Sequence, residues 1–308
     1  MTNRLKSILL TGAHRTGTTW VGRMLAADPH LAYISEPLNV LHRPGVFNWP
    51  VQFWYTYICD ENGSDYLPAF QQLVSYRYHL FAELKSLRSS KDLLRMGRDL
   101  YIFWKALLFH QDPLIKDPFA VFSLPWFAQS LNSQVVVTIR HPAAFASSLK
   151  RLNWTFDFND LLNQPLLMQD HLEPFRKQMR SMAADDVIGQ ASLLWTMVYQ
   201  VVHSTTRQLP SLRVVRHEDL SLDPVTGFHG LYDGLGLTFS PAVERRILSS
   251  SSSENPAELS RKNVHSVKLD SRANLDNWKR RLSAAEIDRV RHATEEVTHI
   301  YYPEVNWN

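Results

Sequence analysis

The feature that most constrains the fold is segment 8–20, an apolar run that leads into a glycine-containing turn. Its sequence is Ile-Leu-Leu-Thr-Gly-Ala-His-Arg-Thr-Gly-Thr-Thr-Trp. Gly12 and Gly17 keep the spacing of the phosphate-binding loop G-x-x-x-x-G-K-S/T, in which backbone N–H groups and a helix N-terminus hold phosphate. Thr18 stands where that pattern has lysine, and Arg15 is the only cation inside the loop. The segment therefore predicts a nucleotide phosphate that is held without phosphoryl transfer.

Composition and charge limit the classes of protein. The chain has 308 residues, of which 44% are hydrophobic and 20% charged, and this is enough for one large core. We expect a single domain over residues 1–308. A net charge of +3 is too small to indicate a nucleic-acid partner, although a local basic pocket would serve an anionic ligand. Cys59 is the only cysteine, so no intrachain disulfide is possible.

The N-terminus and the apolar segments predict a cytoplasmic protein without a transmembrane segment. Residues 1–7 are short and polar, and they lack the apolar stretch and cleavage site of a signal peptide. No run of 18 apolar residues occurs, because Arg95, Arg98 and Lys105 interrupt the most apolar segment.

Strand and helix patterns alternate along the chain. Short apolar or β-branched runs predict strands at Ile8–Thr11, Leu31–Ser35, Pro113–Lys116, Gln134–Ile139 and Leu212–Arg216. Helical patterns occupy about 17–27, 64–87, 91–110, 123–131, 142–152, 187–209, 240–250 and 283–299. Such alternation predicts an α/β protein with a three-layer, P-loop-like fold, in which helices flank a central, mostly parallel sheet. Ligands of such sheets bind at the carboxyl ends of the strands, where Gly12–Thr19, Glu36, Lys116 and Arg140 all fall.

Two long stretches interrupt the alternation and are expected to be insertions that bind an acceptor. The first covers about 41–110 and begins with an aromatic-rich segment, 46–57. The second covers about 153–185 and is polar and mixed. A serine run at 249–253 is typical of a loop.

Several motifs resemble those of one enzyme family, the sulfotransferases that use 3′-phosphoadenosine 5′-phosphosulfate (PAPS). Residues 15–20, Arg-Thr-Gly-Thr-Thr-Trp, resemble the family's 5′-phosphosulfate loop. Residues 135–148 resemble its 3′-phosphate motif, in which a strand-ending arginine precedes a serine by eight residues. Residues 214–220 and 275–279 match two further landmarks in the right order. The likeness spans about 8–282, and its loop features are closest to the carbohydrate sulfotransferases.

The resemblance implies a donor site for PAPS, with PAP as the product and no metal required. The implied donor-binding residues are Arg15, Thr16, Gly17, Thr18, Thr19, Trp20, Arg140, Ser148 and Arg272. Loop N–H groups and threonine hydroxyls suit the 5′-phosphate, and the planar fork of Arg140 suits the 3′-phosphate. Ser148 lies about two helical turns beyond Arg140, so it shares the arginine's side. Trp20 either stacks on the adenine or packs in the core. No His, Cys or Asp cluster has metal-ligand spacing.

The resemblance also implies the catalytic groups of an in-line sulfuryl transfer. Arg15 would neutralise the leaving phosphate oxygen, and Lys116 matches a family lysine near the transferred group; its alternative role is a solvated strand end. Cytosolic relatives place a histidine base where this chain has Pro118. Glu36, in a Glu-Pro pair as in carbohydrate sulfotransferases, is therefore the candidate base. Glu36 could instead pair with Arg15, a cation that would lower its pKa. Two further candidate bases are Asp117 and His14.

The sequence leaves alternatives for the identity of the acceptor and for the functional class of the protein. A saccharide or polysaccharide hydroxyl is favoured, and a small-molecule alcohol, phenol or lipid is the alternative. The aromatic rings of 46–57 could stack on sugars, form a lid or belong to the core. A P-loop kinase would need the loop lysine and a strand-ending Asp for Mg²⁺, where this chain has Arg140. A non-catalytic nucleotide-binding protein would have kept the loop and lost the chemistry.

Overall fold

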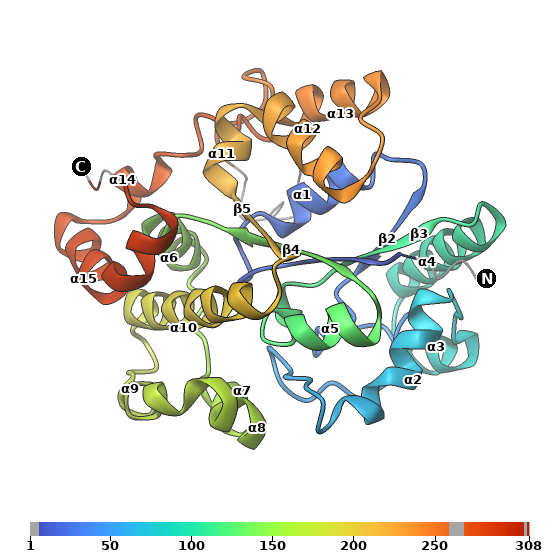
Figure 1. Ribbon diagram of the computed structural model, residues 1–308, viewed down its shortest axis with the longest axis horizontal. Coiled ribbons are helices and arrows are strands. Elements are labelled where there is room, and N and C mark those ends of the chain that lie inside the picture. Colours follow the sequence, from blue (N-terminus) through green and yellow to red (C-terminus); the bar gives the residue numbers. More distant parts are fainter. Residues whose placement is uncertain (1–5, 259–267, 305–306, 308) are drawn as a thin grey trace.

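A computed structural model describes residues 6–258, 268–304 and 307 of the chain. A central sheet of five parallel strands has the order β2-β3-β1-β4-β5 (Figure 1). The strands are β1 (Ile8–Thr11), β2 (Leu31–Ser35), β3 (Asp112–Lys116), β4 (Gln134–Ile139) and β5 (Arg213–Arg216). Each matches a predicted strand to within one residue at either end. The predicted α/β fold with a parallel sheet flanked by helices is confirmed.

The order of the strands brings the chemically important residues to one edge of the sheet. Leu10 of β1 aligns with Lys116 of β3, and Thr11 of β1 aligns with Val137 of β4. Ser35 of β2 also aligns with Lys116, and the next backbone N–H, that of Glu36, donates to the Lys116 carbonyl oxygen over 2.7 Å. Because all five strands point the same way, their carboxyl ends meet at this edge.

Alternate residues of the strands enter two separate cores. Leu10 and Val136 face α1 (Thr18–Leu25), α12 (Pro224–Leu235) and α13 (Pro241–Ser251). Leu9 and Val137 face the opposite layer, which contains α5 (Leu124–Ser130), α6 (Pro142–Leu152) and α10 (Val187–Gln208). Figure 1 shows the two helical layers on either side of the sheet. Both faces are buried, so the strands are continuous apolar runs rather than alternating ones.

The C-terminal part adds helices that the sequence only partly predicts. The predicted helix 283–299 is α15 (Ala284–Tyr301), while α11 (His217–Leu222), α12 and α14 (Asn277–Arg281) were not predicted. A signal for α12 was present, because Asp223 caps the helix and Pro224 is its first residue. The expected loop at 249–253 overlaps the end of α13, at Ser251.

The two long insertions contain short helices. The predicted helix 64–87 is wrong: the structure has α2 (Gly63–Val74) and α3 (Leu80–Ser86). Between them Tyr76 adopts a left-handed conformation, with φ 57°, that a helix does not accommodate. The first insertion continues with α4 (Ser90–Leu108). The second contains α7 (Asn159–Leu162), α8 (Pro165–Leu167) and α9 (Arg176–Ser181).

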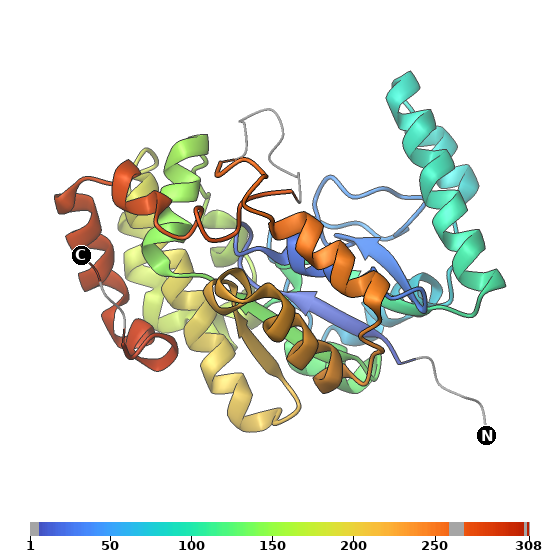
Figure 2. The same cartoon turned by 90° about the horizontal axis from the view of Figure 1, so that it is seen from above.

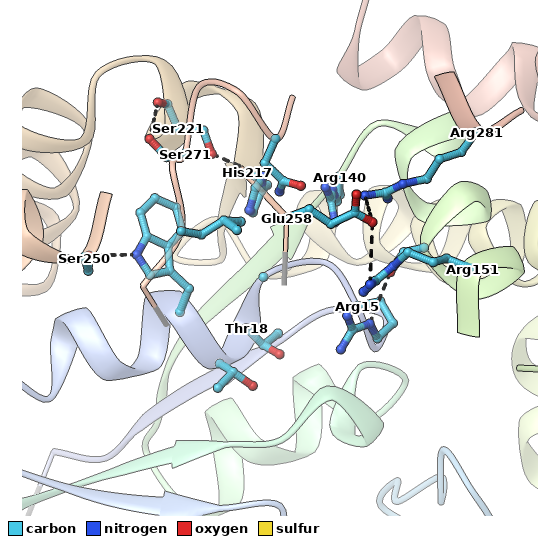
Figure 3. A pocket seen from close by; sticks show the side chains of 16 residues that line it. Arg15, Thr18, Arg140, Arg151, His217, Ser221, Ser250, Glu258, Ser271 and Arg281 are labelled. Carbon is cyan, nitrogen blue, oxygen red and sulfur yellow. Dashed lines mark hydrogen bonds and ion pairs between the residues drawn. The ribbon is translucent and has the colours of Figure 1, made fainter. Parts of the chain in front are cut away.

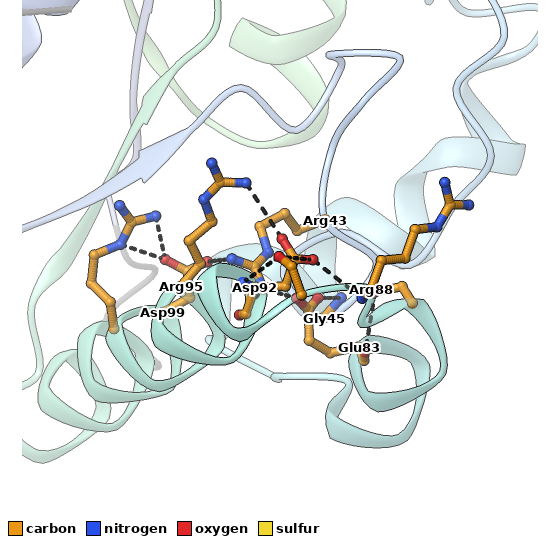
Figure 4. Close-up of polar contacts among 10 residues, drawn as sticks. Arg43, Gly45, Glu83, Arg88, Asp92, Arg95 and Asp99 are labelled. Carbon is orange, nitrogen blue, oxygen red and sulfur yellow. Dashed lines mark hydrogen bonds and ion pairs between the residues drawn. The ribbon is translucent and has the colours of Figure 1, made fainter.

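A buried ion-pair cluster fastens α3 and α4 to the loop after β2 (Figure 4). Arg43 of that loop pairs with Glu83 of α3, and its Nη1 lies 3.5 Å from Asp99 Oδ2 of α4. The other Glu83 oxygen accepts the Gly45 backbone N–H over 2.8 Å. Both carboxylates are buried and charge-compensated, which fixes how α4 lies beside the sheet edge. Within the described ranges, no helix combines the length and apolar character needed to cross a membrane.

Candidate donor and catalytic site

The loop after β1 is held in a shape that only glycine permits at two positions. Gly12 has φ 138°, and a Cβ there would lie 2.3 Å from the Thr138 carbonyl oxygen. Gly17 has φ 94°, and a Cβ there would lie 2.4 Å from His217 Cδ2. Gly17 is also the N-cap of α1, whose first turn contains no acidic side chain. The loop therefore brings the positive end of α1 against the site without a competing carboxylate in that turn.

A cavity of about 130 Å³ lies between this loop and the predicted 3′-phosphate motif, at Arg140 and Ser148 (Figure 3). The residues that line it are Arg15, Gly17, Thr18, Thr19, Trp20, Arg140, Ser148, Arg151, His217, Ser221, Ser250, Glu258, Leu269, Ser271, Asn274 and Arg281. Two motifs about 120 residues apart in the sequence thus meet in one cavity. Seven of the nine residues predicted to bind the donor are among those that line it.

Four guanidinium groups gather in this cavity. Arg15 Nε donates to Ser148 Oγ over 3.2 Å. Arg151 and Arg281 both pair with Glu258 Oε1, at 3.6 and 2.6 Å. Burial and the neighbouring Arg140 and Arg151 lower the pKa of Arg15 to about 10, which leaves it charged at neutral pH. Since Glu258 is the only carboxylate among the described lining residues, the cavity has an excess of positive charge.

Arg140 lines this cavity and has one hydrogen-bond donor without a partner in the described part of the chain. Its Nε is buried and has no hydrogen-bond partner among the described residues. Burial lowers the pKa of Arg140, and the nearby Glu218 opposes this effect. Glu218 is already committed elsewhere, because it accepts from the His141 backbone N–H at 2.9 Å and from the Tyr302 hydroxyl at 2.7 Å. A buried donor left without a partner fits an anionic ligand that would complete it.

Trp20 packs against neighbouring side chains and also lines the cavity. Its Nε1 donates to Ser250 Oγ over 3.0 Å, and its ring packs edge-on against Phe228 with centroids 5.2 Å apart. His217 lies on another side of the ring, with centroids 5.6 Å apart. The ring is half-buried and also lines the cavity. Core packing and contact with a ligand are therefore compatible.

Two residues predicted to bind the donor are placed differently. The Thr16 side chain is buried and turned into the protein, where its hydroxyl bonds to the Ala13 carbonyl at 2.5 Å and to Thr138 Oγ1 at 3.0 Å. Arg272 is exposed, is not among the lining residues, and donates from Nε to the Leu222 carbonyl over 2.9 Å. Its neighbour Ser271 lines the cavity instead. Arg281, rather than Arg272, is the arginine of this C-terminal part that lines the cavity.

Sequence reasoning missed several lining residues. Arg151 follows Ser148 by three residues, so the helical repeat of α6 places both on one face, and this spacing was available in the sequence. His217 lies inside the landmark 214–220, but its place beside the loop is seen only in the structure, from its closeness to Gly17 and Trp20. Arg281 and Ser250 come from distant segments and had no local signal.

The predicted catalytic residues Lys116 and Glu36 form an ion pair. Lys116 Nζ binds Glu36 Oε1, and Asn39 Nδ2 donates to the other oxygen over 2.8 Å. Lys116 is only 2% exposed, so the alternative prediction that it is a solvated residue at a strand end is wrong. Glu36 keeps 27% of its side chain exposed and has φ 54°, a strained conformation for a residue with a Cβ. Arg15 has φ 68°, so two of the three predicted catalytic residues have left-handed backbones.

The two alternative bases are less available than Glu36. Asp117 is fully buried, and its carboxylate accepts from the Leu38 and Phe119 backbone N–H groups at 2.6 and 2.9 Å. Burial raises its pKa to about 7. For His14, the Tyr55 hydroxyl accepts the backbone N–H at 3.1 Å and also lies 2.6 Å from Nδ1. Burial and Arg15 lower the pKa of His14 to about 4.

A second cavity, of about 270 Å³, contains Glu36. The residues that line it are Arg23, Tyr33, Ile34, Ser35, Glu36, Pro37, Asn39, Leu41, His42, Arg43, Val46, Arg95, Arg98, Asp99, Ile102 and Phe103. They come from α1, from β2 and the loop after it, and from α4, so this cavity lies between the sheet edge and the first insertion. Glu36 therefore stands between a fixed cation, Lys116, and a space that can hold another molecule.

Comparisons with known proteins agree with this geometry. A sequence model of the sulfotransferase family matches residues 7–241. The chain belongs to the sulfotransferase family. The family predicted from the sequence is confirmed, and with it an enzyme of the sulfotransferase class. No curated protein matches the chain significantly. Among the described residues, no group of three or more His, Cys, Asp or Glu side chains is arranged to hold a metal ion.

Several solved sulfotransferase structures are similar to the chain. The sulfotransferase domain from the curacin biosynthetic pathway is 18% identical, with 94% of this chain and 98% of that chain covered and a TM-score of 0.46. Sulfotransferase STF9 from Mycobacterium avium is 12% identical, with 98% and 78% covered and a TM-score of 0.48. Mouse sulfotransferase SULT7A1 complexed with PAP is 12% identical, with 96% and 84% covered and a TM-score of 0.45.

Proposed function

We propose that this sulfotransferase moves the sulfuryl group from PAPS to an acceptor hydroxyl and releases PAP. One observation carries the proposal: the two phosphate-binding motifs share a cavity in which a buried Arg140 donor has no partner. A molecule with a 5′-phosphosulfate and a 3′-phosphate needs two anion sites. The α1 N-terminus and the Arg140–Ser148 pair supply two such sites from separate elements.

Each donor contact is assigned to a particular group. The loop N–H groups and the Thr18 and Thr19 hydroxyls hold the 5′-phosphate. Arg140 and Ser148 hold the 3′-phosphate, while Trp20 borders the adenine. The Glu258 carboxylate that bridges Arg151 and Arg281 shows that their guanidinium groups can bind an oxyanion. Arg281 is accordingly a further 3′-phosphate ligand.

The catalytic step uses the charges near the sheet edge. The acceptor oxygen forms a bond to sulfur while the bond from sulfur to the leaving phosphate oxygen breaks. Glu36 accepts the proton of the acceptor hydroxyl, and Arg15 stabilises the leaving oxygen. Once Glu36 is protonated its pairing with Lys116 weakens, and the Lys116 ammonium becomes available to the oxygens around sulfur. The ion pair thus couples proton transfer to charge stabilisation.

A saccharide hydroxyl remains our first candidate for the acceptor, and a small-molecule alcohol, phenol or lipid remains the alternative. Support comes from the cavity beside Glu36, whose arginine, Asn39 and His42 side chains suit hydroxyl and carboxylate groups. The aromatic segment 46–57 gives less support than expected, because Phe47, Tyr55 and Tyr57 are buried in the core. The cytoplasmic location, the single domain and the acceptor-binding role of both insertions also stay predictions.

The test is a transfer assay with radiolabelled PAPS and a panel of saccharides, alcohols and phenols. We expect sulfate to appear on an acceptor in the absence of added metal and we expect PAP, but not ATP with Mg²⁺, to raise the melting temperature. Stabilisation by ATP with Mg²⁺ alone would favour a kinase. Binding of PAP without transfer to any acceptor would favour a non-catalytic nucleotide-binding protein.

A further inference from the structure

Helices α3 and α4 carry a large exposed apolar surface that the proposed chemistry does not use. Its residues are Leu80, Phe81, Leu84, Leu93, Leu94, Tyr101, Trp104, Leu107, Leu108 and Phe109. Phe81 is 80% exposed, Leu94 76% and Trp104 59%. Single exposed apolar residues are common, but ten of them on two helices and the residue that follows α4 point to an interaction surface. We call these residues the α3–α4 face.

The spacing of these residues places them on the outer side of α4. The inner side is defined by Asp99, Phe103 and Ala106, which are buried. Leu94, Tyr101, Trp104 and Leu108 follow one another at helical intervals on the opposite side, so α4 is apolar toward solvent as well as toward the core. Figure 2 shows α4 at the periphery, extending beyond the body of the molecule.

Positive charge borders the α3–α4 face. The exposed cations of the two helices and of the link between them are Lys85, Arg88, Lys91, Arg95 and Arg98, and Lys105 is half-buried. Of the acidic residues, Glu83 and Asp99 are buried and pair with Arg43 (Figure 4), which leaves Asp92 as the partly exposed carboxylate. The border of the apolar face is therefore strongly cationic.

We propose that the α3–α4 face docks on the surface of an anionic lipid bilayer. Leucine and aromatic side chains flanked by Lys and Arg are the composition of helices that lie in the plane of a membrane interface. Charge decides between a bilayer and a second copy of the chain. A two-fold pairing through this face would bring like charges together, whereas anionic headgroups complement them.

Docking would also position the cavity beside Glu36. Arg95, Arg98 and Phe103 of α4 form part of that cavity's wall. A membrane-bound α4 therefore holds the cavity near the headgroups, and the acceptor hydroxyl would belong to a membrane-linked headgroup. This last step rests on the proposed function, while docking itself does not.

Vesicle co-sedimentation tests the docking directly. The full-length protein is mixed with vesicles of phosphatidylcholine, alone or with phosphatidylglycerol. We expect it to bind the anionic vesicles, to bind neutral ones much more weakly, and to dissociate as salt is raised. The double variant Leu94→Asp/Trp104→Asp should lose binding. Lys91→Glu and Lys105→Glu should each weaken it about fivefold or more, since one cation near an anionic surface contributes about 1 kcal/mol.

The control is Ile300→Asp, which places the same charge at an exposed apolar residue of α15, 43% exposed. It should bind anionic vesicles like the unaltered protein. Equal binding to both vesicle types, no binding, or full binding by Leu94→Asp/Trp104→Asp would overturn the proposal. So would self-association through this face without vesicle binding. Melting temperature and PAP affinity, measured on the same variants, should not change, which separates this result from a failure of the proposed function.

Discussion

The two cavities at the sheet edge differ in how their charged side chains are paired. We call the cavity lined by Arg15 and Arg140 the donor side, and the cavity that contains Glu36 the acceptor side. On the donor side four arginines face one carboxylate, Glu258, and the Arg140 Nε has no partner among the described residues. On the acceptor side most of the cations have a carboxylate partner within the protein: Lys116 pairs with Glu36, Arg43 with Glu83 and Asp99, Arg95 with Asp92 and Arg98 with Asp99. We therefore expect the donor side to bind a fixed anion, and the acceptor side to recognise its ligand more through shape and individual hydrogen bonds.

The largest effect should come from Arg15, which lines the donor cavity and is proposed to stabilise the leaving oxygen. Arg15→Ala should lower kcat by about 10³-fold, because the leaving oxygen loses its charged donor. The affinity for PAP should fall much less. Arg15→Lys is the matched control, since it keeps the charge and should recover part of the turnover. Both quantities are measured, by steady-state kinetics and by calorimetry. Comparable losses of kcat and PAP affinity would mean that Arg15 binds the donor without a separate role in the catalytic step.

A smaller loss should follow from removing the carboxylate of Glu36. Glu36→Gln keeps the side-chain shape but cannot accept a proton, so kcat should fall by about 10²-fold while PAP affinity is unchanged. Turnover is measured with saturating PAPS over a range of pH. If Glu36→Gln has the same kcat as the unaltered enzyme, another residue is the base, and the Lys116–Glu36 pair has a structural role.

For Asp117, beside Lys116 in the sequence, the expected effect is on the free energy of unfolding rather than on turnover. Burial, with a further contribution from Glu36, raises its pKa from 3.8 to about 7, so between these values the folded protein keeps a proton that the unfolded chain has released. This contribution to stability is present below pH 3.8 and is lost as pH rises toward 7. Asp117→Asn removes the titration. The difference in unfolding free energy between the two proteins should change across this window, and a constant difference by denaturant titration would contradict it.

The smallest effect concerns Glu258, the carboxylate of the donor cavity. It competes with a phosphate for Arg151 and Arg281, so Glu258→Gln should tighten PAP binding severalfold, and more at low salt. Glu254→Gln, an exposed neighbour that does not line the cavity, is the control and should change nothing. Weaker PAP binding by Glu258→Gln would mean that Glu258 positions the arginines instead of competing for them.

The same two sides differ in how well the sequence predicted them. The donor motifs are local: a strand, a turn and a helix are consecutive, so Gly12–Thr19 and Arg140 with Ser148 could be located before the structure was known. Parallel strands also placed Glu36 beside Lys116. The acceptor side could not be predicted in this way. The break between its helices α2 and α3 includes one left-handed residue, Tyr76, and Phe47 and Tyr55 of the aromatic segment are buried only through contacts with distant residues.

Residues supplied by distant segments were likewise beyond local patterns. Arg281 reaches the donor cavity only because α14 packs beside α6, and Arg272 is kept out of it by its bond to the Leu222 carbonyl. Neither placement follows from the nearby sequence. What the sequence does determine is the backbone of the anion site, and what it leaves open is which distant cations complete it.

The most direct test of the central claim is calorimetric binding of PAP and AMP, which differ by the 3′-phosphate, to the unaltered protein and to Arg140→Ala. An exposed arginine of α10, changed in Arg207→Ala, is the control. We predict that the unaltered protein and the control bind PAP far more tightly than AMP, and that Arg140→Ala loses most of this preference because the 3′-phosphate loses its bidentate partner. An equal loss of affinity for PAP and AMP in Arg140→Ala would contradict the account.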